Sequence, residues 1–160
     1  MRKGLILGAP TIAGQIEIAK RAETAGFDSV WTTEFFHQHG FVRLAAVAGA
    51  TERVKLGTGI AYAFMRTPLL AASAAMDIDE ISGGRMVLGL GSGTRNMNEK
   101  WYSTPFDAAP APRMAEAVGL IRAAIAAAVS KFRLRYDTRL TATEGTSKSV
   151  APAAPATVPL

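Results

Sequence analysis

Residues 83–98 read GGRMVLGLGSGTRNMN, an apolar run that passes into glycines at positions 89, 91 and 93. A dinucleotide-binding loop would carry G-x-G-x-x-G and open directly into a helix. Counted from Gly89, the third glycine of that motif falls on Thr94, and the next segment holds three prolines without a helical period. We therefore expect a strand that ends in a long loop. Two interpretations stay open: close backbone packing at the strand end, or a backbone wall for a flat ligand.

Composition narrows the class of protein. The 160 residues, 49% hydrophobic and 19% charged, suit one globular domain with a core of its own. Without cysteine, neither a disulfide framework nor a thiolate metal site is available. More than half of the net charge of +5 lies in residues 131–160, so we expect no nucleic-acid partner. No apolar run has the length of a membrane span or a signal peptide, so we expect a cytoplasmic protein.

Strand and helix patterns alternate along the chain. The predicted strands are 4–10, 28–34, 54–63 and 85–91, and the predicted helices are 11–26, 41–53, 67–84 and 112–129. Successive β/α units imply a parallel sheet with right-handed crossovers, in an open doubly wound sheet or in part of a (β/α)8 barrel. In both architectures ligands collect at the carboxyl ends of the strands.

Helix ends are marked by their usual residue types. Thr11 and Thr67 are placed to cap two helices at their amino ends, and Pro68 suits the first turn of the second. Gly26 and Gly83 fit the carboxyl ends of the same two helices.

Four segments in fixed order resemble a known family. They are GFDSVWTTEFF (26–36), ERVKLGTGIAYAFMRTP (52–68), DEISGGRMVLGLGSG (79–93) and NEKWY (98–102). Together they resemble the luciferase-like monooxygenase superfamily, which holds flavin-dependent and deazaflavin (F420)-dependent oxidoreductases. The resemblance covers about residues 1–130, and the block around SGGR is its most specific part. Its details are more similar to the F420-dependent branch than to the FMN-dependent one.

The resemblance implies a TIM barrel, of which this chain holds about the first four β/α units, with F420 (or FMN, as the alternative) across the carboxyl face. In F420-dependent relatives a non-prolyl cis peptide in the third strand lies against the ring. The matching bond here is Gly59–Ile60, between Thr58 and Ala61. The alternative for Gly59 is a plain gap for close strand packing.

The same resemblance assigns the glycine loop. Gly91, Gly93 and Thr94 are expected beside the ring and its ribityl chain, and Asn98 matches an asparagine that hydrogen-bonds the cofactor. Under this interpretation the glycines give a flat ring access to the backbone.

Two residues are candidates for catalysis. Glu34 closes the second strand, where relatives place an acidic residue against cofactor or substrate; a capping or salt-bridging role is its alternative. His37 is the candidate proton donor, with a solvated loop histidine as the alternative. The two histidines, His37 and His39, have no carboxylate cluster near them in sequence, so we expect no metal site.

The expected organisation is residues 1–130 as the amino-terminal half of the barrel and residues 131–160 as a hairpin remnant (132–140) followed by a disordered Pro/Ala-rich tail. A barrel half leaves its inner face uncovered, so we expect a homodimer or association with a complementary half. The inner face is expected to expose Ile6, Val30, Leu56 or Ile60, and Val87 or Leu88.

We expect a truncated luciferase-like oxidoreductase that uses F420 or FMN for hydride transfer or monooxygenation of a small organic substrate. The alternative is a non-catalytic half-barrel that binds a ligand or a partner chain.

Overall fold

The computed structural model of the protein describes residues 1–106 and 109–140. In chain order its elements are β1 (Gly4–Ile6), α1 (Ile12–Thr24), β2 (Ser29–Thr32), α2 (Gly40–Ala48), β3 (Lys55–Thr58), β4 (Ala61–Tyr62), α3 (Pro68–Ser82), β5 (Met86–Val87), β6 (Leu90–Gly91), the π-helical turn η1 (Met97–Trp101) and α4 (Pro110–Leu140).

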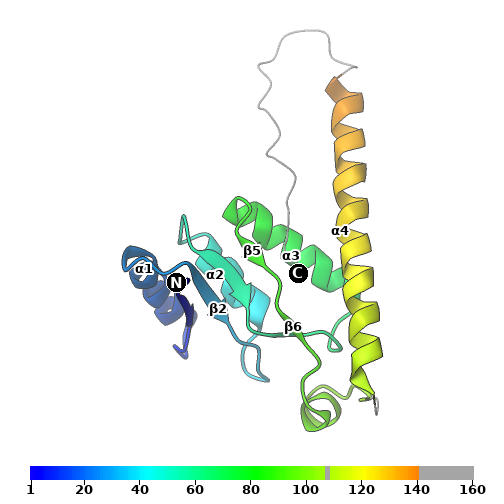
Figure 1. Ribbon diagram of the computed structural model, residues 1–160, viewed down its shortest axis with the longest axis horizontal. Coiled ribbons are helices and arrows are strands. Elements are labelled where there is room, and N and C mark those ends of the chain that lie inside the picture. Colours follow the sequence, from blue (N-terminus) through cyan, green and yellow to red (C-terminus); the bar gives the residue numbers. More distant parts are fainter. Residues whose placement is uncertain (107–108, 141–160) are drawn as a thin grey trace.

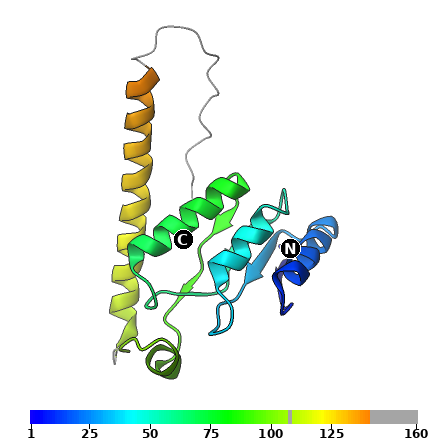
Figure 2. The ribbon, with the colours of Figure 1, turned by 180° about the vertical axis from the view of Figure 1, so that it is seen from behind.

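The strands form parallel sheets. β1, β2, β3 and β5 pair in that order, and β4 pairs with β6. This confirms the predicted α/β class, and the unbroken order of strands along the chain is that of a barrel segment, because a doubly wound sheet reverses direction at its switch point. Figure 2 shows α1, α2 and α3 in front of the sheet, whereas no helix crosses the face that Figure 1 presents. α4 packs against α3 and continues well beyond it.

Two predicted strands are each divided in two. The strand expected at 54–63 breaks between β3 and β4, and the break holds the cis peptide Gly59–Ile60. The strand expected at 85–91 breaks between β5 and β6. At this level the Thr58 hydroxyl donates to the Gly89 carbonyl (2.8 Å) and accepts from the Gly89 N–H (3.0 Å). The Thr58 hydroxyl thus serves the N–H of Gly89 and shares the Gly89 carbonyl with the N–H of Ala61, at the point where both strands are interrupted.

The two faces of the sheet alternate along each strand. The row of Leu5, Val30, Leu56 and Met86 lies under the helices and forms the core with them. The next row, Ile6, Trp31, Gly57 and Val87, lies on the helix-free face. A side chain at Gly57 would collide with the ring of Trp31, which lies across it. The expectation of an exposed inner face therefore holds for Ile6, which is 61% exposed, and is wrong for Val30, which is buried. Of the paired alternatives, Leu56 and Leu88 are buried, whereas Ile60 and Val87 are half-buried.

Helix ends follow the predicted chemistry. The hydroxyls of Thr11 and Thr67 accept from the backbone N–H groups of Gly14 and Leu70, and Pro68 opens α3. Gly83 ends α3 in the left-handed conformation, at φ 68°. α1 stops at Thr24, two residues before Gly26, whose φ is 77°.

Arg85 joins three segments before β5 begins. Its buried guanidinium donates to the carbonyls of Ala48, Thr51, Val54 and Ser82 and to the Thr51 hydroxyl, at 2.7–3.0 Å. Burial lowers the pKa of Arg85, while the charges of Glu23 and Glu52 raise it. Next to it, the N–H of Met86 donates to the carboxylate of buried Asp79 (3.1 Å). We call this set, Asp79 and Ser82–Met86 with Thr51, the arginine corner.

Three predicted boundaries differ from the structure. α2 ends at Ala48 rather than at residue 53, because the Thr51 hydroxyl and Arg85 take its last carbonyls. Residues Met97–Trp101, expected in a loop, form the π-helical turn η1. Residues 132–140, expected as a hairpin, continue α4 to Leu140. No glycine or proline interrupts residues 120–144, so nothing in the sequence ends the helix there. The expected tail at 141–160 lies outside the described residues.

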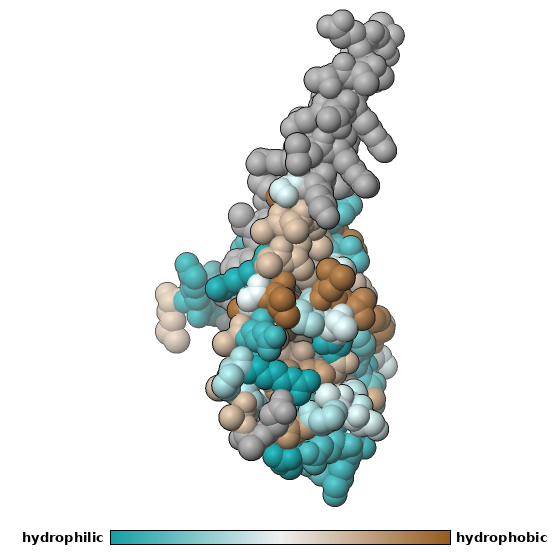
Figure 3. Space-filling view, turned by 90° about the vertical axis from the view of Figure 1, so that its right-hand side faces the viewer, coloured by the Kyte–Doolittle hydropathy of each residue, from teal (hydrophilic) through white to brown (hydrophobic). Residues whose placement is uncertain are grey.

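The helices of the described part of the chain include none with the length and apolar character needed to cross a membrane. On the side of the molecule that Figure 3 presents, apolar residues gather among polar ones. The large exposed apolar residues of α3 and α4 are Leu69, Leu70, Ile81 and Leu120.

Candidate functional site

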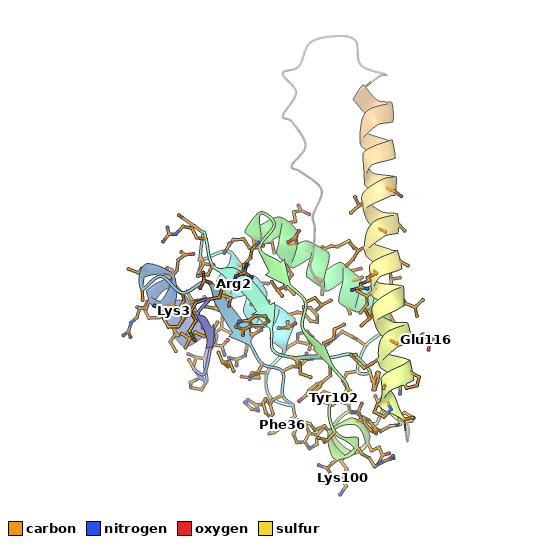
Figure 4. The ribbon with its side chains drawn as sticks, viewed as in Figure 1. Arg2, Lys3, Phe36, Lys100, Tyr102 and Glu116 are labelled. Carbon is orange, nitrogen blue, oxygen red and sulfur yellow. The ribbon has the colours of Figure 1, made fainter. Side chains whose placement is uncertain are left out.

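An open cleft of about 610 Å³ lies at the carboxyl end of the strands. Its walls come from the loop after β2, the start of α2, the residues after β4, the first turns of α3, and Tyr102. The lining residues are Glu34, Phe35, Phe36, His37, Gln38, His39, Phe41, Met65, Arg66, Leu70, Ala74 and Tyr102. Figure 4 shows Phe36 and Tyr102 at this end of the molecule, with Lys100 pointing away into solvent.

Glu34 and Arg66 form an ion pair in the floor of the cleft. Arg66 Nη1 donates to Glu34 Oε2 (3.0 Å), and Arg66 Nη2 donates to Glu34 Oε1. The backbone N–H of Tyr62 also donates to Glu34 Oε2 (2.8 Å), and Arg66 Nη1 reaches the carbonyl of Tyr62 (3.3 Å). The guanidinium lies 5.0 Å from the centre of the Phe41 ring. The pair therefore ties the end of β2 to the end of β4.

This geometry bears on the role predicted for Glu34. Both carboxylate oxygens are engaged, and the side chain is almost fully buried. The salt-bridging alternative is the arrangement that the structure shows. To accept a proton from a substrate, Glu34 would have to leave Arg66 unpaired. The sequence analysis missed Arg66; the only signal for it was a basic residue between a strand end and the helix cap Thr67.

The two histidines differ in their surroundings. His37 is exposed in the loop after β2, and its ring meets that of Phe36 edge-on with 4.9 Å between centres. His39 accepts a long hydrogen bond (3.4 Å) from the Val42 N–H and so caps α2, and its Nδ1 lies 4.0 Å from Glu34 Oε1. Of the two, His37 is the one whose ring has no hydrogen-bond partner among residues 1–106 and 109–140.

The cis peptide lies at the same end of the sheet. Thr58, beside it, is fully buried, and its hydroxyl is committed to Gly89. Ala61 is also buried, and its N–H donates to the Gly89 carbonyl (2.9 Å). Gly59 and Ile60 are half-buried, so their backbone is the part of this segment that a ligand can reach.

The glycine loop is packed by its own protein. A side chain at Gly91 would collide with Ile60, and one at Gly93 would lie 3.1 Å from the Tyr62 ring and 3.2 Å from the Asn98 amide. Gly93 also needs its left-handed φ of 68°. Close packing therefore accounts for the absence of side chains at both positions.

Asn98 organises the loop. Its amide nitrogen donates to the carbonyls of Ser92 and Thr94, each at 2.8 Å, and its side chain is buried. The Thr94 hydroxyl accepts from the N–H of Met97 (3.2 Å) as η1 begins. The amide oxygen of Asn98 is buried and has no hydrogen-bond partner among the described residues. A ring N–H is the kind of group that would satisfy it.

Aromatic rings close the outer edge of the cleft. Phe36 is 69% exposed and meets Trp101 edge-on at 5.2 Å, and Phe35 lies 6.3 Å from Trp101. The loop after β2 and the turn η1 are thereby held together. Of the predicted residues, Glu34 and His37 line this cleft, while Thr58–Ala61 and Gly91–Asn98 form a second group at the ends of β3–β6.

Comparison with known proteins gives relatives for most of the described chain. A Mycobacterium tuberculosis protein named "Putative coenzyme F420-dependent oxidoreductase Rv3520c" is 38% identical over 125 residues, 76% of this chain and 36% of that protein. An F420-dependent secondary alcohol dehydrogenase, solved with an F420-acetone adduct, matches 76% of this chain and 41% of its own with 26% identity and a TM-score of 0.67. The monooxygenase RslO1 of Streptomyces bottropensis matches 76% of this chain and 42% of its own, with 30% identity and a TM-score of 0.62.

The chain thus spans about a third of the length of the curated relative it matches. The model of the luciferase-like monooxygenase family matches residues 2–159, nearly the whole sequence. The parallel β/α units, the cis bond at Gly59–Ile60 and these matches agree, and we conclude that the chain belongs to the luciferase-like monooxygenase family.

Proposed function

We propose that this chain forms part of an F420-dependent oxidoreductase that acts on a small organic substrate, with FMN as the alternative cofactor. The observation that carries the proposal is that the half-buried Gly59–Ile60 backbone, the Asn98 loop and the cleft lie at one end of the sheet. F420-dependent proteins among the relatives support the choice of cofactor.

Different parts of the chain have different tasks in this proposal. The Gly59–Ile60 backbone, held in place by buried Thr58 and Ala61, would give the ring a fixed surface, and Gly91, Gly93 and Thr94 would lie beside the ring and its ribityl chain. The Asn98 amide oxygen, which is buried and has no hydrogen-bond partner among the described residues, would accept from an N–H of the ring. Bound F420 supplies a hydride donor and acceptor.

Proton handling belongs to the cleft. Glu34, paired with Arg66, holds the strand ends at fixed separation and keeps the floor free of net charge. His37 stays our candidate for the proton donor at the cofactor, because its exposed ring lies at the cleft wall. The aromatic rim of Phe35, Phe36 and Trp101 limits the access of water.

A second candidate is a half-barrel that binds ligand or a partner chain without turnover. The exposed Ile6 on the helix-free face favours it, since this face has no covering layer among the described residues. A homodimer or a complementary chain would supply one. For both candidates we propose a cytoplasmic location.

Titration of the chain with F420, followed by F420 fluorescence, tests the first candidate. Ile60→Ala is expected to weaken binding about tenfold by removing apolar contact with the ring. Lys20→Gln is the control, because Lys20 is exposed on α1 and belongs neither to the cleft nor to the Asn98 loop. Absence of F420 and FMN binding would reject the proposal. Binding without reduction of any ketone by reduced F420 would favour the second candidate, and sedimentation with and without F420 would then show whether copies associate.

A further inference from the structure

Tyr102 occupies a defined place in the cleft. It follows η1, and its ring lies 6.0 Å from that of Tyr62. The backbone N–H of Thr104 donates to the carbonyl of buried Asn98 (2.9 Å), and Ser103 between them has a left-handed φ of 53°. This turn anchors the segment that carries Tyr102, so its ring is presented to the cleft from a fixed backbone.

The hydroxyl of Tyr102 has no hydrogen-bond partner in residues 1–106 and 109–140. The hydroxyl of Tyr62, in contrast, is directed at the sulfur of Met97 (3.6 Å). Burial raises the pKa of Tyr102, the charge of Glu34 raises it further, and Arg66 opposes this. The hydroxyl therefore keeps its proton at neutral pH and is available as a donor.

The other polar groups of the cleft floor are occupied. The Gln38 amide nitrogen donates to the hydroxyl (2.8 Å) and carbonyl of Thr33. Arg66 donates to both carboxylate oxygens of Glu34 and to the carbonyl of Tyr62, and Glu34 balances its charge. Apart from the histidines, Glu34 and Arg66 are the only ionisable lining residues that are charged at neutral pH, and their charges cancel. Such a floor suits a neutral ligand better than a carboxylate or a phosphate.

The outer wall of the cleft favours flat, apolar ligands. Phe35 and Phe36 line it, and Trp101 braces both rings from η1. Exposed aromatic faces gain from stacking on a flat ligand, and their two side-chain torsions lose little entropy on binding.

We propose that the Tyr102 hydroxyl is the hydrogen-bond donor of this cleft and that it holds the carbonyl oxygen of a neutral aromatic substrate packed against Phe35 and Phe36. The inference rests on the proposed function, whose substrate it narrows to neutral aromatic carbonyl compounds and the matching alcohols. Tyr102 thereby becomes the residue that places the reacting carbon of such a substrate.

Two probes of the same shape test the inference on the full chain. Acetophenone carries a carbonyl acceptor, and α-methylstyrene carries a methylene group in its place. Their dissociation constants are measured by chemical-shift titration. Tyr102→Phe is expected to weaken acetophenone binding about three- to tenfold, the usual effect of losing one neutral hydrogen bond, and to leave α-methylstyrene within about twofold. Tyr62→Phe is the matched control and should change neither, because its hydroxyl faces Met97.

The inference would be overturned if neither probe bound, or if Tyr102→Phe weakened the binding of both probes equally. It would also be overturned if His37→Gln, rather than Tyr102→Phe, selectively weakened acetophenone binding, or if benzoate bound more tightly than acetophenone. The F420 titration of the same variants separates the two proposals. Selective loss of acetophenone in a chain that does not bind F420 would support Tyr102 and reject the cofactor.

Discussion

Arg85 and Arg66 lie at opposite ends of the same parallel strands, and their surroundings differ. Arg85, at the amino end, forms no ion pair within residues 1–106 and 109–140 and donates there to four carbonyls and one hydroxyl. Arg66, at the carboxyl end, is held by Glu34. The polar groups next to Arg85 are hydrogen-bonded to Arg85 or to one another. Near Arg66, in contrast, the Tyr102 hydroxyl and the His37 ring line the cleft and have no hydrogen-bond partner within the described residues.

The comparison of the two arginines separates a region that stabilises the fold from a region that can bind a ligand. The arginine corner closes the gaps between α2, α3 and β5, and its full hydrogen bonding leaves it nothing with which to bind a ligand. The cleft carries unpaired groups beside a neutralised ion pair, which is how a small-molecule site is usually built. The SGGR part (82–85) of the most specific sequence block thus belongs to the arginine corner and to the fold rather than to the cleft.

The largest expected effect is at the arginine corner. Arg85→Met should lower the free energy of unfolding by about 4 kcal/mol, because it leaves several buried carbonyls without a donor. Urea denaturation measures this, with exposed Arg95→Met as the control, expected within about 0.5 kcal/mol of the parent. A loss below about 1 kcal/mol would show that the corner is not a stabilising element.

The next effect concerns the ion pair of the cleft. Glu34→Gln should destabilise the fold by about 3 kcal/mol, since it leaves Arg66 without its counter-charge. Combined with Arg66→Gln in a double-mutant cycle, the two changes should show a coupling of about 1–3 kcal/mol. If Glu34→Gln left stability unchanged and abolished only turnover, Glu34 would be a catalytic base and the contrast between the two ends would fail.

A smaller effect is expected at the junction between the divided strands. Thr58→Val keeps the shape of the side chain and removes the hydroxyl that accepts from the Gly89 N–H, at a cost of about 2 kcal/mol, while the Gly89 carbonyl keeps the Ala61 N–H as its donor. Thr24→Val, which removes an exposed hydroxyl bonded to the Lys20 carbonyl, is the control and should be close to neutral. Similar unfolding midpoints for the two variants would contradict the role given to Thr58.

The smallest expected effect is a pH dependence of the free energy of unfolding, caused by Glu23 at the amino end of the strands. Burial raises the pKa of Glu23, but N–H groups of Arg53, Val54 and Glu52, together with the charge of Arg53, lower it below its usual 4.5. The folded pKa is the lower one, so this stabilisation is complete above about pH 4.5 and is lost as the pH falls through the folded pKa. For Asp79, burial raises the pKa, and this outweighs the lowering by the Met86 N–H and by the charge of Lys55. The contribution of Asp79 to stability therefore changes with pH in the opposite direction to that of Glu23.

Unfolding free energies of Glu23→Gln and the parent chain, measured between pH 6 and pH 3, test this. The variant should lose less stability on acidification. Parallel curves would mean that Glu23 does not contribute to the pH dependence.

The sequence predicted the helix ends well where a capping side chain and its backbone partner lie within a few residues of each other. Thr11, Thr67 and Gly83 cap their helices as expected, and the family resemblance predicted the cis bond at Gly59–Ile60 correctly. The divided strands were missed because the contacts at their interruption, between the Thr58 hydroxyl and Gly89, join positions far apart in the sequence. The early end of α2 was missed for the same reason, since Arg85 supplies its last donor.

The candidate site was predictable in location and less so in detail. Parallel strands bring their carboxyl ends together, so Glu34, Gly59 and Gly91 had to share one end of the sheet. Which groups are already paired depends on packing: Glu34 is bound to Arg66, and the Thr58 hydroxyl to Gly89. The assignments of His37, Ile60 and Asn98 to catalysis and cofactor binding stay predictions.

The ring of Trp31 that lies across Gly57 gives the protein an optical label. The chain has two tryptophans: Trp31 is on the helix-free face, with its indole N–H bonded to the Ser29 hydroxyl (2.9 Å), and Trp101 is at the aromatic rim. Indole emission shifts to shorter wavelength when water is removed from around the ring. An element that covers the helix-free face should therefore change the emission of Trp31, while a ligand in the cleft should change that of Trp101. Two variants, each with one tryptophan replaced by phenylalanine, keep one of these signals each. Comparison of their emission spectra then distinguishes assembly of this chain from occupation of its cleft.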